Sequence, residues 1–262
     1  MRKHLSRTIA LAIGISLLVA IAAAAKPHTV GVEKVEAGNL VLTDAGGIFP
    51  RRLPRHRQAP ITAELHATIA TKDGTHPPAA RQLSIDFDRT LQVNAKGLPS
   101  CSAGRLKARS TSAAKRACPG AIVGFGKAEV EVAFPEQKPF TASGPLTAFN
   151  GGVHGGTTLL FVHTYIDVPA PTAVVVEARI TKESKGRYGM HTVTRIPPIA
   201  GGAGSPVGFE LKLGRKFTYK GRRESYLTGS CPTGVYFTQG HVKFSDGTVL
   251  HVTHPLPCTP EG

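Results

Sequence analysis

The chain has 262 residues, of which 41% are hydrophobic and 19% are charged, and its formal net charge is +15. These proportions exclude an intrinsically disordered chain, and the length fits one large domain or two small ones. Glycine (29) and proline (20) together form nearly a fifth of the chain. Because helix interiors tolerate both residues poorly, we expect many turns and few long helices.

The N-terminus has the pattern of a secretory signal peptide. Arg2, Lys3 and Arg7 precede the uncharged apolar run 8–25, which ends in four alanines. We expect export with cleavage of residues 1–25 and a secreted or envelope-associated protein. Retention as an N-terminal anchor stays open, because 18 apolar residues lie near the lower limit for spanning a bilayer. No later segment is apolar enough to predict a transmembrane span after cleavage.

The charge of the mature chain predicts the kind of partner. Loss of Arg2, Lys3 and Arg7 leaves 29 basic against 17 acidic residues, a charge of +12. In an exported protein such a charge favours an anionic cell-envelope polymer or lipid headgroups, and we expect no nucleic acid partner. A basic surface that serves only solubility is the alternative.

Residues 26–59 predict an extended N-terminal segment that could contain short strands at 30–35 and 39–43 and ends in a basic, proline-broken linker at 50–57. From residue 61 the apolar and polar residues alternate, which is typical of half-buried strands. Residues 60–262 are therefore expected to form a β domain, either undivided or split into two β subdomains. The expected strands are 61–71, 83–93, 122–134, 140–149, 157–166, 173–181, 188–196, 207–213, 217–219, 226–229, 235–244 and 248–254.

Four cysteines, Cys101, Cys118, Cys231 and Cys258, predict two disulfides in an exported chain. Of three possible pairings we favour Cys101 with Cys118 and Cys231 with Cys258, because each pair is close in sequence and flanked by proline. Metal ligation would need closely spaced cysteine pairs, so no metal or other cofactor is expected. Alanine- and lysine-rich residues between Cys101 and Cys118 predict a short helical insertion.

About a dozen short strands without strand–helix alternation predict an all-β fold. We expect an antiparallel β-sandwich, jelly-roll-like, with the helical insertion between Cys101 and Cys118. Asp246-Gly247 lies between the last two expected strands and is a strong hairpin signal.

Five segments together form a recognisable pattern. They are Cys118-Pro119-Gly120-Ala121-Ile122-Val123-Gly124-Phe125-Gly126, Leu146-Thr147-Ala148-Phe149-Asn150-Gly151, Ile196-Pro197-Pro198-Ile199-Ala200-Gly201-Gly202, Cys231-Pro232-Thr233-Gly234 and Phe244-Ser245-Asp246-Gly247. In these segments the chain resembles a family of uncharacterised exported β-rich proteins of soil actinobacteria. The resemblance covers roughly residues 60–258 and implies a signal peptide, a Cys-helix-Cys segment and a β fold, with no known activity.

Ionisable residues suggest two weaker candidates for chemistry. His241 and His251 could meet across the last hairpin, whereas His251 and His254, three apart in a strand, should point to opposite faces. Asp86 with Asp88 and Glu129 with Glu131 each share a strand face. Such pairs could serve glycoside hydrolysis or bind calcium, although a solvated polar face is the simpler interpretation.

Motifs for nucleophilic catalysis and phosphate binding are missing from the sequence. It has no Gly-x-Ser-x-Gly elbow, and Ser205 follows Gly204 but precedes a proline. The glycine-rich loops have no helix signal or Gly-Lys-Ser/Thr after them, so we interpret them as plain loops.

Basic residues interleaved with Phe217 and Tyr219 are the best indication of a binding surface. We therefore expect an envelope or extracellular protein that is structural or binding and not an enzyme. The alternative is a secreted hydrolase or carbohydrate-active enzyme that uses the strand carboxylates. The expected anion-binding residues are Lys212, Arg215, Lys216, Lys220, Arg222 and Arg223.

Overall fold

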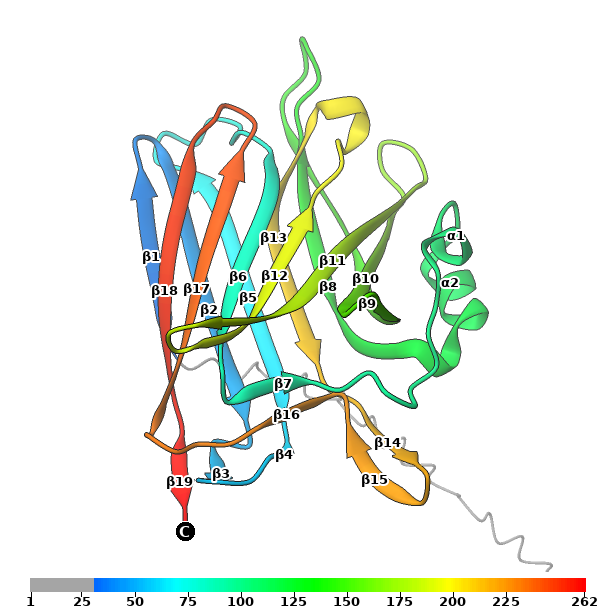
Figure 1. Ribbon diagram of the computed structural model, residues 1–262. Coiled ribbons are helices and arrows are strands. Elements are labelled where there is room, and N and C mark those ends of the chain that lie inside the picture. The colour runs from blue at the N-terminus through cyan, green and yellow to red at the C-terminus, as the bar shows by residue number, and fades with distance from the viewer. Residues whose placement is uncertain (1–30) are drawn as a thin grey trace, which may run out of the picture.

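A computed structural model describes residues 31–262, so the signal peptide expected at residues 1–25 lies outside the described part. About 62% of the described residues are strand and 7% are helix, which confirms the all-β class. Most of the strands belong to one 12-stranded sheet (Figure 1). In spatial order they are β1 (Val32–Ala37), β2 (Leu40–Phe49), β5 (Thr62–Thr71), β13 (Gly204–Leu213), β8 (Ile122–Val132), β9 (Phe140–His154), β10 (Thr157–Ile166), β11 (Thr172–Lys185), β12 (Tyr188–Arg195), β6 (Ala80–Asp88), β17 (Val235–Phe244) and β18 (Val249–Pro257).

Every neighbouring pair in this sheet is antiparallel. The segment expected to be an extended N-terminal part is integral to the sheet in its described portion, because β2 pairs with β5 along ten residues. The expected strand 83–93 is interrupted. Asp88 accepts hydrogen bonds from the backbone N–H and the hydroxyl of Thr90, and the resulting turn separates β6 from β7 (Leu91–Val93).

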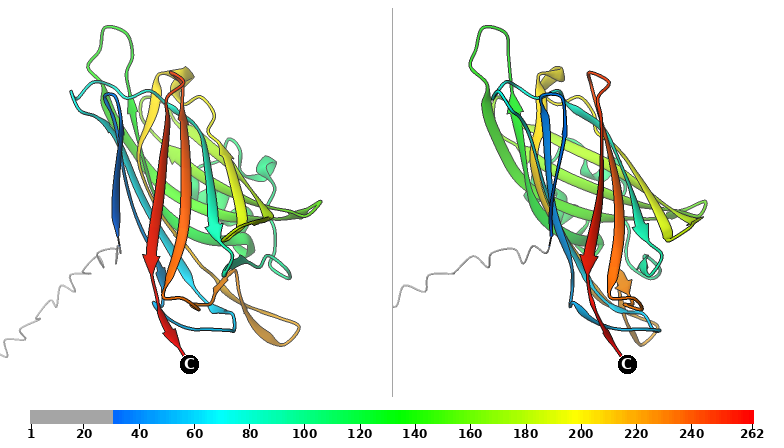
Figure 2. Two further views of the ribbon diagram at one scale, coloured as in Figure 1. Left: turned by 60° about the vertical axis from the view of Figure 1, so that its left-hand side comes forward. Right: turned by 90° about the vertical axis from the view of Figure 1, so that its left-hand side faces the viewer.

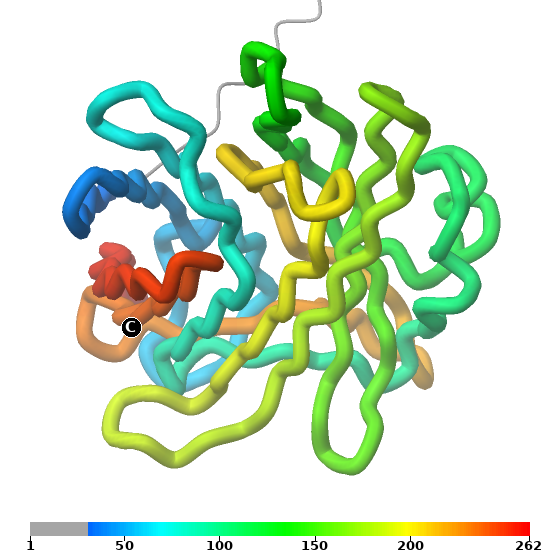
Figure 3. Tube along the Cα trace, turned by 90° about the horizontal axis from the view of Figure 1, so that it is seen from above, coloured from blue at the N-terminus to red at the C-terminus, as the bar shows by residue number. Residues whose placement is uncertain are grey.

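The sheet curls round on itself, so that β18 comes to lie beside β1 although the two are not hydrogen-bonded neighbours (Figures 2 and 3). A jelly-roll of two stacked sheets is therefore not confirmed. Glycines inside the strands allow the curl. A Cβ on Gly126 would lie 1.8 Å from the Glu210 carbonyl oxygen, and one on Gly144 would lie 2.4 Å from that of Tyr165. Only glycine permits such close approach, and glycine kinks are a known device for bending sheets.

The interior has two different halves. On one side β2 and β5 pack directly against β6, β17 and β18 through a cluster that includes Leu42, Ala67, Val242, Phe244 and Leu250. This half resembles a sandwich in its packing. On the other side, the side chains of β8 to β12 and of β5, β6 and β13 leave a space between them that they only partly fill.

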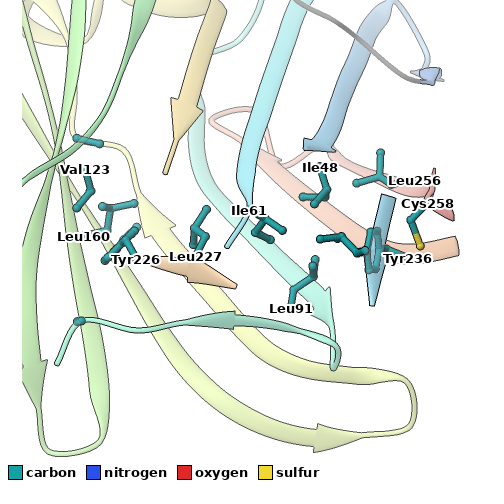
Figure 4. Close-up of a cluster of buried hydrophobic side chains, with 14 of the residues drawn as sticks. Ile48, Ile61, Leu91, Val123, Leu160, Tyr226, Leu227, Tyr236, Leu256 and Cys258 are labelled. Carbon is teal, nitrogen blue, oxygen red and sulfur yellow. The ribbon is translucent and has the colours of Figure 1, made fainter. Parts of the chain in front are cut away.

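Short strands close the lower end of the curled sheet. β4 (Ala59–Pro60), β16 (Leu227–Gly229) and β7 form a three-stranded sheet, and β3 (Arg52–Pro54) pairs with β19 (Thr259–Glu261). A buried cluster runs across this base from Val123 and Leu160 through Tyr226 to Tyr236 and Leu256 (Figure 4). The expected Cys231–Cys258 disulfide joins it and is confirmed.

A helical cover lies on the outer face of β9 and β10 (Figure 1). It consists of α1 (Ala103–Leu106), α2 (Thr111–Ala117) and the 3-10 turn η1 (Pro119–Ala121). The expected Cys101–Cys118 disulfide is confirmed and joins the two ends of the α1–α2 segment. Leu106 and Ala114 are fully buried against Phe149 and Phe161. Among residues 31–262, no helix has the length and hydropathy needed to cross a membrane.

Candidate functional site

The partly filled half of the interior is a cavity of about 280 Å³. Strand alternation creates most of its lining, because every second residue of β10, β11 and β12 faces it, and β5, β6, β8, β9 and β13 complete the wall. In β10, for example, Leu160, Val162 and Ile166 face the cavity, while Phe161 and His163 lie on the face that the helices cover. The walls are therefore mostly aliphatic.

Several lining side chains are only half-buried in spite of their position inside the molecule. Leu65, Ile85, Val176, Met190 and Leu211 all belong to this group. They keep accessible apolar surface because the cavity lies opposite them in place of other side chains. A bound apolar molecule would cover that surface and gain roughly 25 cal/mol for each Å².

Three residues that line the cavity carry a hydroxyl group with no hydrogen-bond partner within the described protein. They are Thr164 on β10, Thr192 on β12 and Tyr226 at the base, and all three hydroxyl oxygens are buried. Burial raises the pKa of the Tyr226 hydroxyl far above its ordinary value, so it stays protonated. Unpartnered buried hydroxyls cost free energy, and sites that hold them often serve a ligand.

A second hollow of about 290 Å³ lies at the upper end. It shares Val130, Ile166, Val174 and Ile199 with the cavity, so the two spaces adjoin. The β8–β9 turn, the β10–β11 turn and the residues around η2 (Ala200–Gly202) form its rim (Figure 1). Val168 on this rim is 55% exposed. Apolar residues therefore line both the upper hollow and the adjoining cavity.

The expected anion-binding residues divide into two groups. Lys212 forms an ion pair with Glu64 at 2.7 Å, and Arg215 donates to the carbonyl oxygens of Gly120 and Ile122 at 2.6 and 2.8 Å. Lys212 thus links β13 to β5, and Arg215 links the segment after β13 to η1 and the start of β8. The other four, Lys216, Lys220, Arg222 and Arg223, are exposed on the hairpin of β14 (Lys216–Tyr219) and β15 (Arg222–Ser225).

That hairpin projects at the base, at the end opposite the cavity rim (Figure 1). Gly97 makes its packing possible, because a Cβ there would lie 2.1 Å from the Tyr219 ring, and the positive φ of 82° suits glycine. The surface cations that sequence predicted and the interior cavity are therefore separate features.

The four strand carboxylates are not brought together. Asp86 bonds His191, and Asp88 accepts from Thr90 and from the backbone N–H of Phe237. On β8, Glu129 pairs with Lys127, and Glu131 pairs with His76. Each carboxylate has its own partner, and Asp86 lies with His191 on the face of the sheet opposite the cavity, so the two pairs do not form one site.

The histidines of the last hairpin lie as their spacing predicts. His241 and His251 are directly opposite, with their Nδ1 atoms 2.5 Å apart. Burial, and next the neighbouring His251, lower the pKa of His241. His254 lies on the other face of β18, where it is buried and bonds the Asp44 carboxylate at 2.7 Å.

Ser205, His76 and Glu131 form an arrangement that the sequence did not suggest. The Ser205 hydroxyl is 3.0 Å from Nε2 of His76, and Nδ1 of the same ring is 2.7 Å from the Glu131 carboxylate. The geometry has the outline of a nucleophile, a base and an orienting acid. However, Ser205 is only 2% exposed, and its hydroxyl donates to the Pro77 carbonyl oxygen at 2.7 Å.

A hydroxyl has a single hydrogen to donate, and the shorter bond is the one to Pro77. A nucleophile must also be reachable by its substrate. We therefore interpret these three residues as a clamp that fixes the β5–β6 loop to β8 and β13. No local motif could have indicated it, because Ser205 and His76 are 129 residues apart in sequence.

Comparisons with known proteins leave the cavity as the main guide to function. No protein-family model matches the chain, no similar protein was found among curated sequences, and no solved structure was found to match it.

Proposed function

We propose that this protein is an exported, non-enzymatic binding protein that holds an apolar small molecule inside its curled sheet. The observation that carries the proposal is the aliphatic cavity of about 280 Å³ with unpartnered hydroxyls in its wall. Ligand sites in proteins are typically apolar hollows with a small number of polar groups that orient the ligand.

The lining indicates the chemistry of the ligand. Thr164, Thr192 and Tyr226 can each donate and accept a hydrogen bond, and none carries a charge. Glu129 borders the cavity, but its carboxylate is engaged by Lys127. A neutral lipid-like molecule, with an aliphatic body and a hydroxyl, ester or carbonyl group, fits this lining best.

Export and an anionic partner belong to the same proposal. The N-terminal sequence pattern and two disulfides, which are compatible with an oxidising compartment, support export. The four exposed cations of the β14–β15 hairpin support contact with an anionic envelope polymer or lipid headgroups. In this arrangement the base would contact the envelope while the cavity rim faces away from it.

A matched pair of variants tests the cavity. Ala63 and Ala70 lie on the same strand, β5, but Ala63 lines the cavity and Ala70 is exposed on the outer face. The probe is N-phenyl-1-naphthylamine, a neutral apolar dye whose fluorescence rises when it leaves water. We expect saturable binding of one dye per chain, at least about tenfold weaker in Ala63→Phe because the new ring fills the cavity, and unchanged in Ala70→Phe.

Organic extraction of the purified protein followed by mass spectrometry would identify a natural ligand. Dye binding that does not saturate, or that Ala63→Phe leaves intact, would contradict the proposal. Circular dichroism of both variants checks that the phenylalanine has not unfolded the sheet.

A further inference from the structure

A cluster of three potential metal ligands lies on the outer face of the sheet, away from the cavity. Asp86 on β6, Glu183 on β11 and His191 on β12 each offer one ligand atom, and these atoms lie within 4.8 Å of one another. The three residues come from three neighbouring strands, so the sheet itself holds their backbones in place.

Strand register explains why the three meet. His191 lies directly opposite Asp86, and its Nδ1 is 2.5 Å from the Asp86 carboxylate. The pairing of β11 with β12 shifts between Lys182 and Lys185, and Glu183 lies within that irregularity. Bulges of this kind re-aim side chains and occur often at functional sites.

The Glu183 carboxylate gives an independent indication of a ligand. Its Oε1 atom is buried and has no hydrogen-bond partner within the described protein. Asp86 beside it is 5% exposed. Two carboxylates brought this close together, one with an unsatisfied oxygen, are costly unless a positive charge compensates them.

We propose that Asp86, Glu183 and His191 bind a divalent transition-metal ion of the zinc type. One imidazole and two carboxylates are a ligand set for Zn²⁺, whereas Ca²⁺ and Mg²⁺ prefer oxygen ligands only. The ion takes the place of the proton in the hydrogen bond between His191 and Asp86. The ligand atoms then lie ~3.3 Å from one another, as tetrahedral coordination of zinc requires. Water completes the coordination, since the His191 side chain is 37% exposed.

The test is calorimetric titration of Zn²⁺ into the tag-free full chain after treatment with a chelator. We expect one ion per chain and at least about a tenfold loss of affinity in Glu183→Gln, which removes one charge but keeps the size of the side chain. His191→Gln should abolish binding. X-ray absorption of the loaded protein should show nitrogen and oxygen ligands at about 2.0–2.2 Å.

Two control variants separate this site from its surroundings. Glu177→Gln changes an outer-face carboxylate of the same strand that pairs with Arg179, and His251→Gln breaks the nearby His241–His251 pair. Both should bind Zn²⁺ as the wild type does. Binding that is lost in His251→Gln but kept in Glu183→Gln would overturn the assignment, as would equal affinity for Mg²⁺ or no saturable binding. Glu183→Gln keeps the test valid if His191→Gln fails to fold.

Discussion

The hydroxyl oxygens of Thr164 and Thr192 are buried and have no hydrogen-bond partner within the described protein. Both residues are buried, at 7% and 8% exposure, within a wall that is otherwise aliphatic. A valine of the same shape would avoid the cost of an unsatisfied hydroxyl. Under the proposed function, a polar group of the ligand would bond these hydroxyls and remove that cost.

Substitution of Thr192 by valine tests this interpretation. We expect Thr192→Val to stabilise the protein by about 1 kcal/mol, or roughly 2–4 °C in Tm, because an unsatisfied buried hydroxyl is removed. The same change should weaken binding of the extracted natural ligand. Thr194→Val is the control, since Thr194 lines the same cavity but its hydroxyl is not among the buried unpartnered atoms. If calorimetry gives the same melting temperature for wild type and Thr192→Val, the Thr192 hydroxyl does not destabilise the folded protein.

His163 gives the molecule a source of acid sensitivity. Its ring is fully buried under the helical cover, and Nε2 donates to the Arg109 carbonyl oxygen at 2.9 Å. Burial lowers the pKa of His163 below its ordinary value of 6.5. The folded protein therefore holds this ring neutral, whereas the unfolded chain takes up a proton below about pH 6.5.

Stability contributed by the neutral ring is complete above about pH 6.5 and is lost as the pH falls below that value. We expect His163→Gln to flatten the decrease in unfolding free energy between pH 7 and 5, by up to about 1.4 kcal/mol per pH unit. Urea titrations at several pH values measure this, and His154→Gln, at an exposed histidine, is the control. Parallel pH profiles for wild type and His163→Gln would rule out the assigned role.

The two disulfides stabilise different elements. Cys101 and Cys118 are 17 positions apart and enclose α1 and α2, whereas Cys231 and Cys258 are 27 positions apart and lie at the base. Helices this short are not stable alone, so the cover depends on its packing and on the crosslink.

Replacing Cys101 and Cys118 together with serine should cost about 3 kcal/mol by the loop-entropy relation. We expect hydrogen exchange to quicken across residues 102–117 while β10 (Thr157–Ile166) keeps its protection. The corresponding Cys231 and Cys258 variant should show the reverse, with faster exchange at β16 and β17 and an unchanged cover. Uniformly faster exchange in both variants would show that the cover is not a separate unit.

The β14–β15 hairpin is the element on which the expected anionic partner can be tested. We expect the protein to bind phosphatidylglycerol vesicles more strongly than phosphatidylcholine vesicles, and the binding to weaken as salt increases. Neutralising the hairpin with glutamine at Lys216, Lys220, Arg222 and Arg223 should remove most of the binding. The control variant removes the same number of charges elsewhere on the surface and should keep its binding. Its glutamines replace the exposed Lys107, Arg109, Arg116 and Lys138. Vesicle binding is measured by sedimentation. Binding that does not change with salt concentration, or with removal of the hairpin charges, would contradict the predicted partner.

At the scale of the whole molecule, one curled sheet combines a packed half with a hollow half. The packed half, with Phe244 and Leu250, supplies a conventional core. The hollow half leaves apolar surface that a ligand can cover, so folding and binding are coupled.

Saturating N-phenyl-1-naphthylamine should therefore raise the melting temperature. A ligand at a hundred times its Kd adds about 2.7 kcal/mol, which corresponds to roughly 5–10 °C for a chain of this size. Differential scanning fluorimetry with a dye of different emission, or calorimetry, measures the shift. Ala63→Phe should show almost none of it, and an equal shift in that variant would place the dye elsewhere.

Much of the fold could be predicted from the sequence because strand formation and disulfide pairing depend on local patterns. Alternating residues gave the bounds of β10 (Thr157–Ile166) and β17 (Val235–Phe244), and sequence proximity gave both disulfide pairs. The export signal and the anionic partner remain predictions.

Only the tertiary structure decided what the inward strand faces meet. Alternation shows that Leu65 and Ile85 share a buried face, but not whether that face meets another sheet or a cavity, because this depends on curvature accumulated over twelve strands. The grouping of Asp86, Glu183 and His191 also depended on the tertiary structure. Asp86 stood out as a carboxylate, yet His191 is 105 residues away and Glu183 is aimed by a register shift. Long-range register and curvature are properties of the assembled sheet, and no single strand encodes them.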